Sequence, residues 1–74
     1  MNREALLAHL AETEALIVLG EQNIARQREV VDGMRRDGHP LDHAARILAT
    51  FEATQAIHLA DRETLRRQIA QTTP

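Results

Sequence analysis

The fold of this chain is decided by residues 34–41, MRRDGHPL, which separate two long stretches of helix-forming residues. The glycine at position 38 suits the left-handed conformation that ends many helices, and the proline at position 40 suits the first turn of a new helix. We therefore predict one helix over about residues 2–36, a turn over 37–40 and a second helix over about 40–71. A connection this short makes the two helices antiparallel neighbours.

Each helical stretch carries one stripe of seam positions at alternating spacings of four and three residues, the spacing of a coiled-coil seam. The stripes mirror each other about the break, so that folding the chain pairs positions whose residue numbers add to 75. The first stripe is Leu6, Leu10, Thr13, Ile17, Gly20, Ile24, Gln27, Val31 and Met34. The second is Leu41, Ala44, Leu48, Phe51, Gln55, His58, Arg62, Leu65 and Ile69. We predict an all-α fold, an antiparallel two-helix hairpin with a coiled-coil seam.

Capping and charge patterns support this register. Asn2 is expected to cap the first helix, and residues 72–74 are expected to fray at the other end of the hairpin. On one flank of the seam, Glu14 is placed to meet Arg66. Two heptads further along the first helix, Arg28 is placed to meet Glu52. Exposed pairs of this kind are each worth roughly a few tenths of a kcal/mol, so they select the register more than they stabilise the fold.

A second apolar face lies on the other flank of the seam. It consists of Leu16, Leu19, Val30, Ile47 and Ile57, with Asn23 and Thr54 among them. A single hairpin cannot cover this face, and an apolar patch of this kind marks an interface. We therefore predict that two hairpins bury it against each other as a homodimeric four-helix bundle. The alternative is a monomer with scattered exposed aliphatic residues.

The composition also favours a partner chain. The chain has 74 residues, enough for one domain, with no cysteine and a single aromatic residue, Phe51. A core of this size contributes about 3–5 kcal/mol at most, and small domains usually add disulfides, metal or another chain. Disulfides are excluded here, so oligomerisation is the expected source of stability.

Polar residues occupy the middle of the predicted seam. Gly20 is paired with Gln55, Ile17 with His58, and Thr13 with Arg62. Buried polar residues lower stability but fix the register and the oligomeric state, since a slip leaves their hydrogen bonds unmade. We expect Gly20 to make room for Gln55 or for a helix of the partner chain. A ligand pocket at this level is the functional alternative.

The histidines give only a weak metal signal. The i, i+4 spacing of His39 and His43 is that of paired zinc ligands, but Pro40 puts His39 in the turn. His9 and Glu12 are three residues apart, yet the Glu-x-x-His repeat of di-iron bundles is missing from the sequence. We assign these residues to caps and solvated surface, and keep a small metal-binding bundle as a third hypothesis.

The sequence does not favour an enzyme. It has no serine, cysteine, tyrosine or lysine and no glycine-rich phosphate loop. A hairpin offers no concave scaffold that excludes water from a substrate. We predict a non-enzymatic interaction module without a cofactor or a catalytic residue.

The charge balance argues against a nucleic-acid partner. Nine arginines meet eleven carboxylates, giving a net charge of −2, and both signs mix near the turn. Even so, the architecture is analogous to plasmid-encoded Rop-type RNA-binding dimers, which makes such a dimer the second hypothesis.

The longest apolar run, residues 15–19, is too short to span a membrane, and no secretory segment precedes it. We expect a cytoplasmic protein.

Several short stretches resemble those of a group of short bacterial proteins that has no established activity. The likeness spans most of residues 20–66 and is carried by residues 23–28 (NIARQR), 37–39 (DGH), 48–52 (LATFE) and 58–62 (HLADR). Pro40 departs from the polar residue expected at that position, which affects only the capping of the second helix. The resemblance implies a bacterial cytoplasmic helical hairpin and implies nothing about a substrate.

Overall fold

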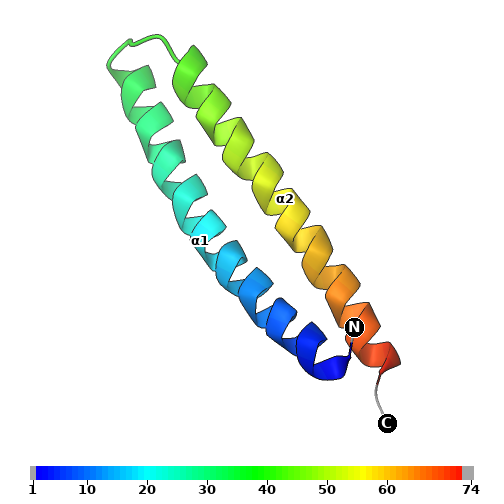
Figure 1. Ribbon diagram of the computed structural model, residues 1–74. Helices are drawn as coiled ribbons and strands as arrows, with labels where there is room; N and C mark the ends of the chain where they lie inside the picture. The colour runs from blue at the N-terminus through cyan, green and yellow to red at the C-terminus, as the bar shows by residue number, and fades with distance from the viewer. Residues whose placement is uncertain (1, 73–74) are drawn as a thin grey trace.

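The computed structural model describes residues 2–72, which form two antiparallel α-helices packed side by side (Figure 1). Helix α1 spans Arg3–Arg36 and helix α2 spans Asp42–Gln71, and the described residues include no strand. The hairpin is rod-shaped, and its Cα atoms extend over 58 × 14 × 13 Å. The predicted all-α hairpin is thereby confirmed. Neither helix of the described part is long and apolar enough to cross a membrane.

Helix α1 begins at the predicted cap. The Asn2 side chain accepts a hydrogen bond from the Ala5 backbone N–H at 2.8 Å, which satisfies one of the free donors of the first turn. Glu4 adds a negative charge near the positive end of the helix dipole. Asn2 is therefore the N-cap, as the sequence predicts. Residues 73 and 74, where part of the expected fraying falls, lie outside the described residues.

Helix α1 ends in a Schellman motif built on Gly38. Gly38 has a φ of 75°, and its N–H donates to the Arg35 carbonyl at 3.2 Å. The next N–H, that of His39, donates to the Met34 carbonyl at 2.9 Å. These two bonds satisfy carbonyls that the helix itself leaves free, and the positive φ explains why glycine is needed here. The predicted role of Gly38 is confirmed.

Helix α2 begins later than the sequence suggests. Pro40 was expected in its first turn, but the helix starts at Asp42 with Leu41 as the N-cap. The Leu41 carbonyl accepts the first helical bond, from Ala45 N–H at 2.8 Å, while its side chain forms no capping hydrogen bond in the described chain. After Gly38 ends α1, residues 39–41 are needed to cross to the second helix, so Pro40 lies in the connection rather than in the first turn of α2.

The packing follows the predicted seam. Every seam position of both stripes is buried or half-buried. Among residues 2–72, the other residues that are not exposed are Asn23, Gly33 and Ile47. The core itself is thin: within the same residues, no large side chain is completely shielded from solvent. The hairpin thus buries one stripe from each helix and little else.

Two interhelical ion pairs confirm the register. Arg28 Nη2 lies 3.3 Å from Glu52 Oε2, and Arg66 Nη2 lies 3.6 Å from Glu14 Oε1. All four side chains are largely solvent-exposed, so each pair contributes little net stability. Their value is that a shift by one residue would separate them.

Candidate interaction groove

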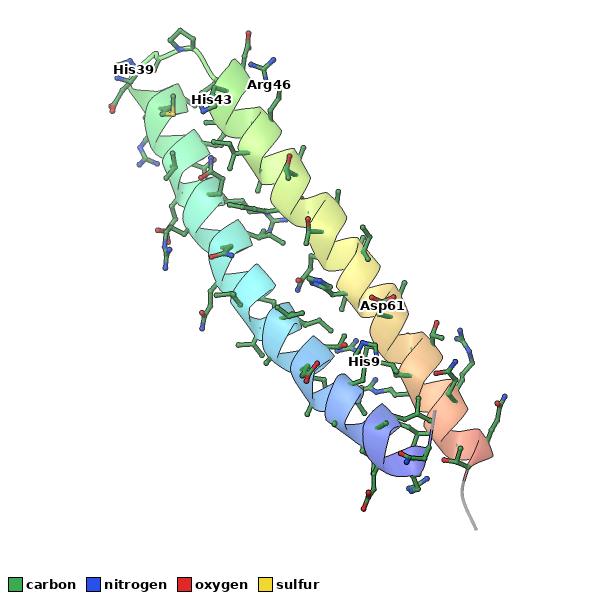
Figure 2. All side chains as sticks on the ribbon, in the orientation of Figure 1. His9, His39, His43, Arg46 and Asp61 are labelled. Atoms are coloured by element: carbon green, nitrogen blue, oxygen red, sulfur yellow. The ribbon has the colours of Figure 1, made fainter. Side chains whose placement is uncertain are left out.

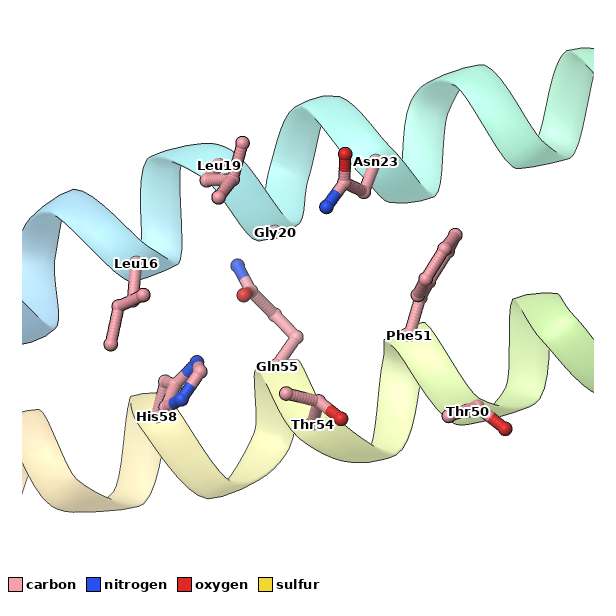
Figure 3. A pocket seen from close by; sticks show the side chains of 9 residues that line it. All are labelled: Leu16, Leu19, Gly20, Asn23, Thr50, Phe51, Thr54, Gln55 and His58. Atoms are coloured by element: carbon pink, nitrogen blue, oxygen red, sulfur yellow. The ribbon is translucent and has the colours of Figure 1, made fainter.

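A shallow, mostly apolar groove runs along one face of the hairpin, between α1 and α2 (Figure 3). Its central section has a volume of about 320 Å³, and a neighbouring section of about 400 Å³ continues it toward the turn. The two sections share Thr50 and Phe51, so they form one continuous surface. The central section is lined by Leu16, Leu19, Gly20, Asn23, Thr50, Phe51, Thr54, Gln55 and His58. The second is lined by His43, Arg46, Ile47, Thr50 and Phe51.

The groove overlaps the second apolar face predicted from sequence. Leu16 and Leu19 line its central section, and Ile47 lines the section nearer the turn. Val30 and Ile57 line neither section, but both are exposed, Ile57 to 61%. Each lies one heptad from a lining residue, Val30 from Asn23 and Ile57 from Thr50, and so shares its side of the helix.

The helical repeat explains why these residues stay uncovered. Side chains rotate by about 100° per residue, so the stripe that contains Leu16 and Asn23 lies roughly a quarter-turn from the buried seam. One neighbouring helix can cover the seam but not a stripe at that angle. In a four-helix bundle both stripes are covered, because each helix touches two neighbours on adjacent sides.

Gln55 is the most buried residue that lines the groove. It is only 7% exposed, and its Nε2 donates to the Ile17 backbone carbonyl at 2.9 Å. Figure 3 shows its amide reaching from α2 toward Gly20 on α1. A methyl group at Gly20 would place its carbon 2.8 Å from the Gln55 Cδ atom. Gly20 was expected to make room either for Gln55 or for a helix of a partner chain. Within the hairpin, it makes room for Gln55.

The oxygen of the Gln55 amide is buried without a hydrogen-bond partner among residues 2–72. It faces the Gly20 backbone, which offers only a weak C–H donor. A buried acceptor left unpaired costs about 1–3 kcal/mol. Because less than 1 Å² of this oxygen is accessible, a ligand in the groove cannot reach it without first turning the amide. The Gln55 amide oxygen is therefore not open to a ligand in this conformation.

The other two predicted polar residues differ in their surroundings. His58 is half-buried and lines the groove beside Gln55. Arg62 lies one helical turn further along, and its Nε is 3.5 Å from Glu63 Oε1 without a hydrogen bond to any described residue. The three residues share one side of α2, but they are not linked to one another by any hydrogen bond within residues 2–72.

Sequence reasoning missed part of the groove. Thr50, His43 and Arg46 line it but were not assigned to the second face. A signal was present for two of them: Thr50 lies one heptad before Ile57, and His43 lies one heptad before Thr50. Phe51 was assigned only to the seam, although this half-buried residue also lines the groove.

The histidines are dispersed over the hairpin. His39 lies in the turn, His43 near the start of α2 and His9 in the first half of α1 (Figure 2). Over residues 2–72, no group of three or more histidine, aspartate or glutamate side chains is arranged to hold a metal ion. The described residues thus offer no observation that supports the metal hypothesis.

Several arginines are engaged with carboxylates rather than aligned as a track for phosphates. Arg28 contacts Glu52 across the helices, as noted above. Arg35 Nη1 lies 3.2 Å from Asp32 Oδ1, and Arg66 Nη1 lies 3.2 Å from Glu63 Oε1. These contacts intersperse both signs along the exposed surface, the opposite of the one-sign stripe typical of nucleic-acid binders.

Comparison with known proteins adds no relative. No protein-family model matches the chain, and neither the curated proteins nor the solved structures give a significant match. The resemblance to short bacterial helical-hairpin proteins therefore stays a prediction.

Proposed function

We propose that this protein is a non-enzymatic, self-associating interaction module whose hairpins pair through the groove as a homodimeric four-helix bundle. The observation that carries the proposal is the continuous, mostly apolar groove on a hairpin whose own core is thin. Leu19, for example, is 52% exposed although it lines the groove. Exposed apolar surface of this kind is removed from water when two copies meet.

The dimensions of the hairpin fit a stable dimer. The Cα atoms extend over 58 by 14 Å, a projected area of roughly 800 Å², and each partner of a standard protein–protein interface buries about the same area. Apolar area contributes about 25 cal/mol per Å², so a few hundred Å² of aliphatic surface supplies several kcal/mol of driving force. That contribution is comparable to the whole stability expected of an isolated hairpin of this size.

The proposed dimer leaves other apolar residues on its outside. Leu7, Val18 and Leu59 are exposed and do not line the groove. We infer that the assembled bundle presents its outer helical surfaces to another protein. The paired arginines and the net charge of −2 give no reason to extend the proposal to RNA.

A paired set of variants tests the use of the groove. Leu19→Glu with Ile57→Glu places charges on the groove face and is expected to convert the dimer to monomer with lower helicity. Val18→Glu with Leu59→Glu makes the same chemical change at exposed residues outside the groove. That control is expected to keep the dimer mass in analytical ultracentrifugation. Equal behaviour of the two double variants would contradict the proposal.

A further inference from the structure

We propose that the second copy docks antiparallel on the groove, with the two turns at opposite ends and a two-fold axis perpendicular to the helices at Asn23. This inference rests on the proposed function, since it specifies how the two hairpins pair. It follows from a symmetry in the residues of the groove face and from the charges at the two ends of that face.

Helix α2 carries a self-complementary pattern centred on position 52. Ile47 and Ile57 lie five residues to either side of the centre, and Thr50 and Thr54 lie two residues to either side. An antiparallel copy of α2 related by a two-fold axis at this level would place like beside like, isoleucine against isoleucine and threonine against threonine. An isologous interface must be complementary to itself, and a face whose residue types repeat about its centre meets that condition.

Helix α1 carries a matching pattern centred on position 23. Leu16 and Val30 each lie seven residues from Asn23, on the same side of the helix. An antiparallel copy would therefore set Leu16 of one chain against Val30 of the other. Asn23 would meet its own counterpart, and two carboxamides can donate to and accept from each other.

The two centres lie at the same level of the hairpin. Positions 23 and 52 add to 75, the sum that pairs residues across the seam, and the contact of Gly20 with Gln55 obeys the same sum. A single two-fold axis therefore serves both helices at once. Nothing in the packing within one hairpin requires this coincidence, because these residues lie outside the seam.

The charges at the ends of the face favour the same arrangement. His43 and Arg46 lie near the turn and Asp61 lies toward the other end of α2 (Figure 2). In the antiparallel dimer, Asp61 of each copy faces His43 of the other, with Arg46 nearby. If the turns instead lay at the same end, α2 of one copy would lie on α1 of the other, with residues whose numbers add to 75 at the same level. Asp61 would then lie at the level of position 14, and Glu12 is the nearby acidic residue on the groove side of α1. The first arrangement brings Asp61 close to the positive Arg46 twice, and the second brings two carboxylates together twice.

Spin-label distances distinguish the two arrangements. The chain has no cysteine, so a nitroxide on Arg36→Cys is unique in each copy. In the antiparallel dimer each label lies 13 residues from the two-fold axis at Asn23. At a rise of about 1.5 Å per residue, the two labels are about 40 Å apart. The same-end arrangement places them under about 30 Å apart, at the diagonal of a bundle with 8–10 Å between neighbouring axes. Labels on Gln22→Cys, close to the axis on the same side of α1, are the matched control and stay under about 30 Å in both.

Charge reversal gives a second, independent test. Asp61→Lys is expected to weaken dimerisation by roughly threefold or more at low salt, with a smaller effect at high salt. Glu29→Lys makes the same change on the side of α1 opposite the seam and is expected to leave the dimerisation constant unchanged. A long distance at position 36 with a weakened Asp61→Lys dimer is the result that supports the proposal. Short distances at both labelled positions, or a strengthened Asp61→Lys dimer, would overturn the antiparallel arrangement while leaving dimerisation intact. A labelled protein of monomer mass would overturn the proposed function itself.

Discussion

The Gln55 side chain of α2 occupies the space that a side chain at position 20 of α1 would need. A carbon added to Gly20 would lie 2.8 Å from Gln55 Cδ, inside van der Waals contact. Glycine costs about 1 kcal/mol of helix stability relative to alanine, so its presence in mid-helix calls for a structural reason. The buried amide of Gln55, held by its bond to the Ile17 carbonyl, supplies that reason.

This relationship predicts a coupling between the two positions. In the native background, Gly20→Ala is expected to leave the free energy of unfolding unchanged or to lower it, because the amide must move and lose its hydrogen bond. In a Gln55→Ala background, the same change is expected to raise it by about 1 kcal/mol, the helix-propensity difference. Denaturant unfolding of the four proteins measures the coupling. Equal effects in both backgrounds would show that the contact has no energetic role.

Replacing Gln55 and His58 together with leucine is expected to stabilise the protein. The change removes the unpartnered amide oxygen, and leucines that pack in these layers contribute roughly 1–3 kcal/mol each. The expected cost is a less unique assembly, visible as mixed oligomers or broadened spectra. Melting temperature and mass distribution are the measurements. A strongly destabilised variant with a single oligomeric state would instead indicate a specific function for these two side chains.

Arg62 is expected to tolerate loss of its charge. Its side chain is 29% exposed, and its Nε has no hydrogen bond within residues 2–72. Arg62→Met keeps the apolar stem and removes the buried donor, so we expect a change in unfolding free energy of at most about 1 kcal/mol. Thermal unfolding of the variant checks this. A loss of several kcal/mol would mean that the contact with Glu63 is far stronger than its 3.5 Å geometry indicates.

Two glycines near the turn are expected to respond in opposite directions to the same substitution. Gly38→Ala should lower stability by about 1 kcal/mol, because φ is 75° there and the Schellman motif depends on it. Gly33→Ala should raise stability by up to about 1 kcal/mol, since it lies within α1 and its nearest neighbour, the Arg36 guanidinium, is 3.7 Å away. Unfolding of the two variants side by side provides the comparison, and a loss at both sites would contradict the assignment.

Much of the hairpin is predictable because its information is local or periodic. The caps at Asn2 and Gly38 depend on short-range chemistry, and the seam depends on spacing that two helices share. The start of α2 was harder to place, because Leu41 lacks a capping side chain and Pro40 is compatible with either a turn or a first helical residue.

The groove was predictable only in part. Its aliphatic residues follow from heptad position, and so do Thr50 and His43, which precede Ile57 by one and two heptads. Arg46 carries no comparable signal, and the seam position of Phe51 does not reveal that its side chain also lines the groove. The direction of the Gln55 amide and the absence of a partner for its oxygen within the described residues depend on side-chain geometry. Spacing alone does not encode such geometry.

The mass of the unmutated protein in solution tests the central claim most directly. Sedimentation equilibrium at tens of micromolar is expected to give about twice the chain mass of 8.3 kDa, with helicity that falls on dilution as the dimer dissociates. A mass of 8.3 kDa over the same range, with undiminished helicity, would contradict the account, because the hairpin would then be stable with its groove exposed to water.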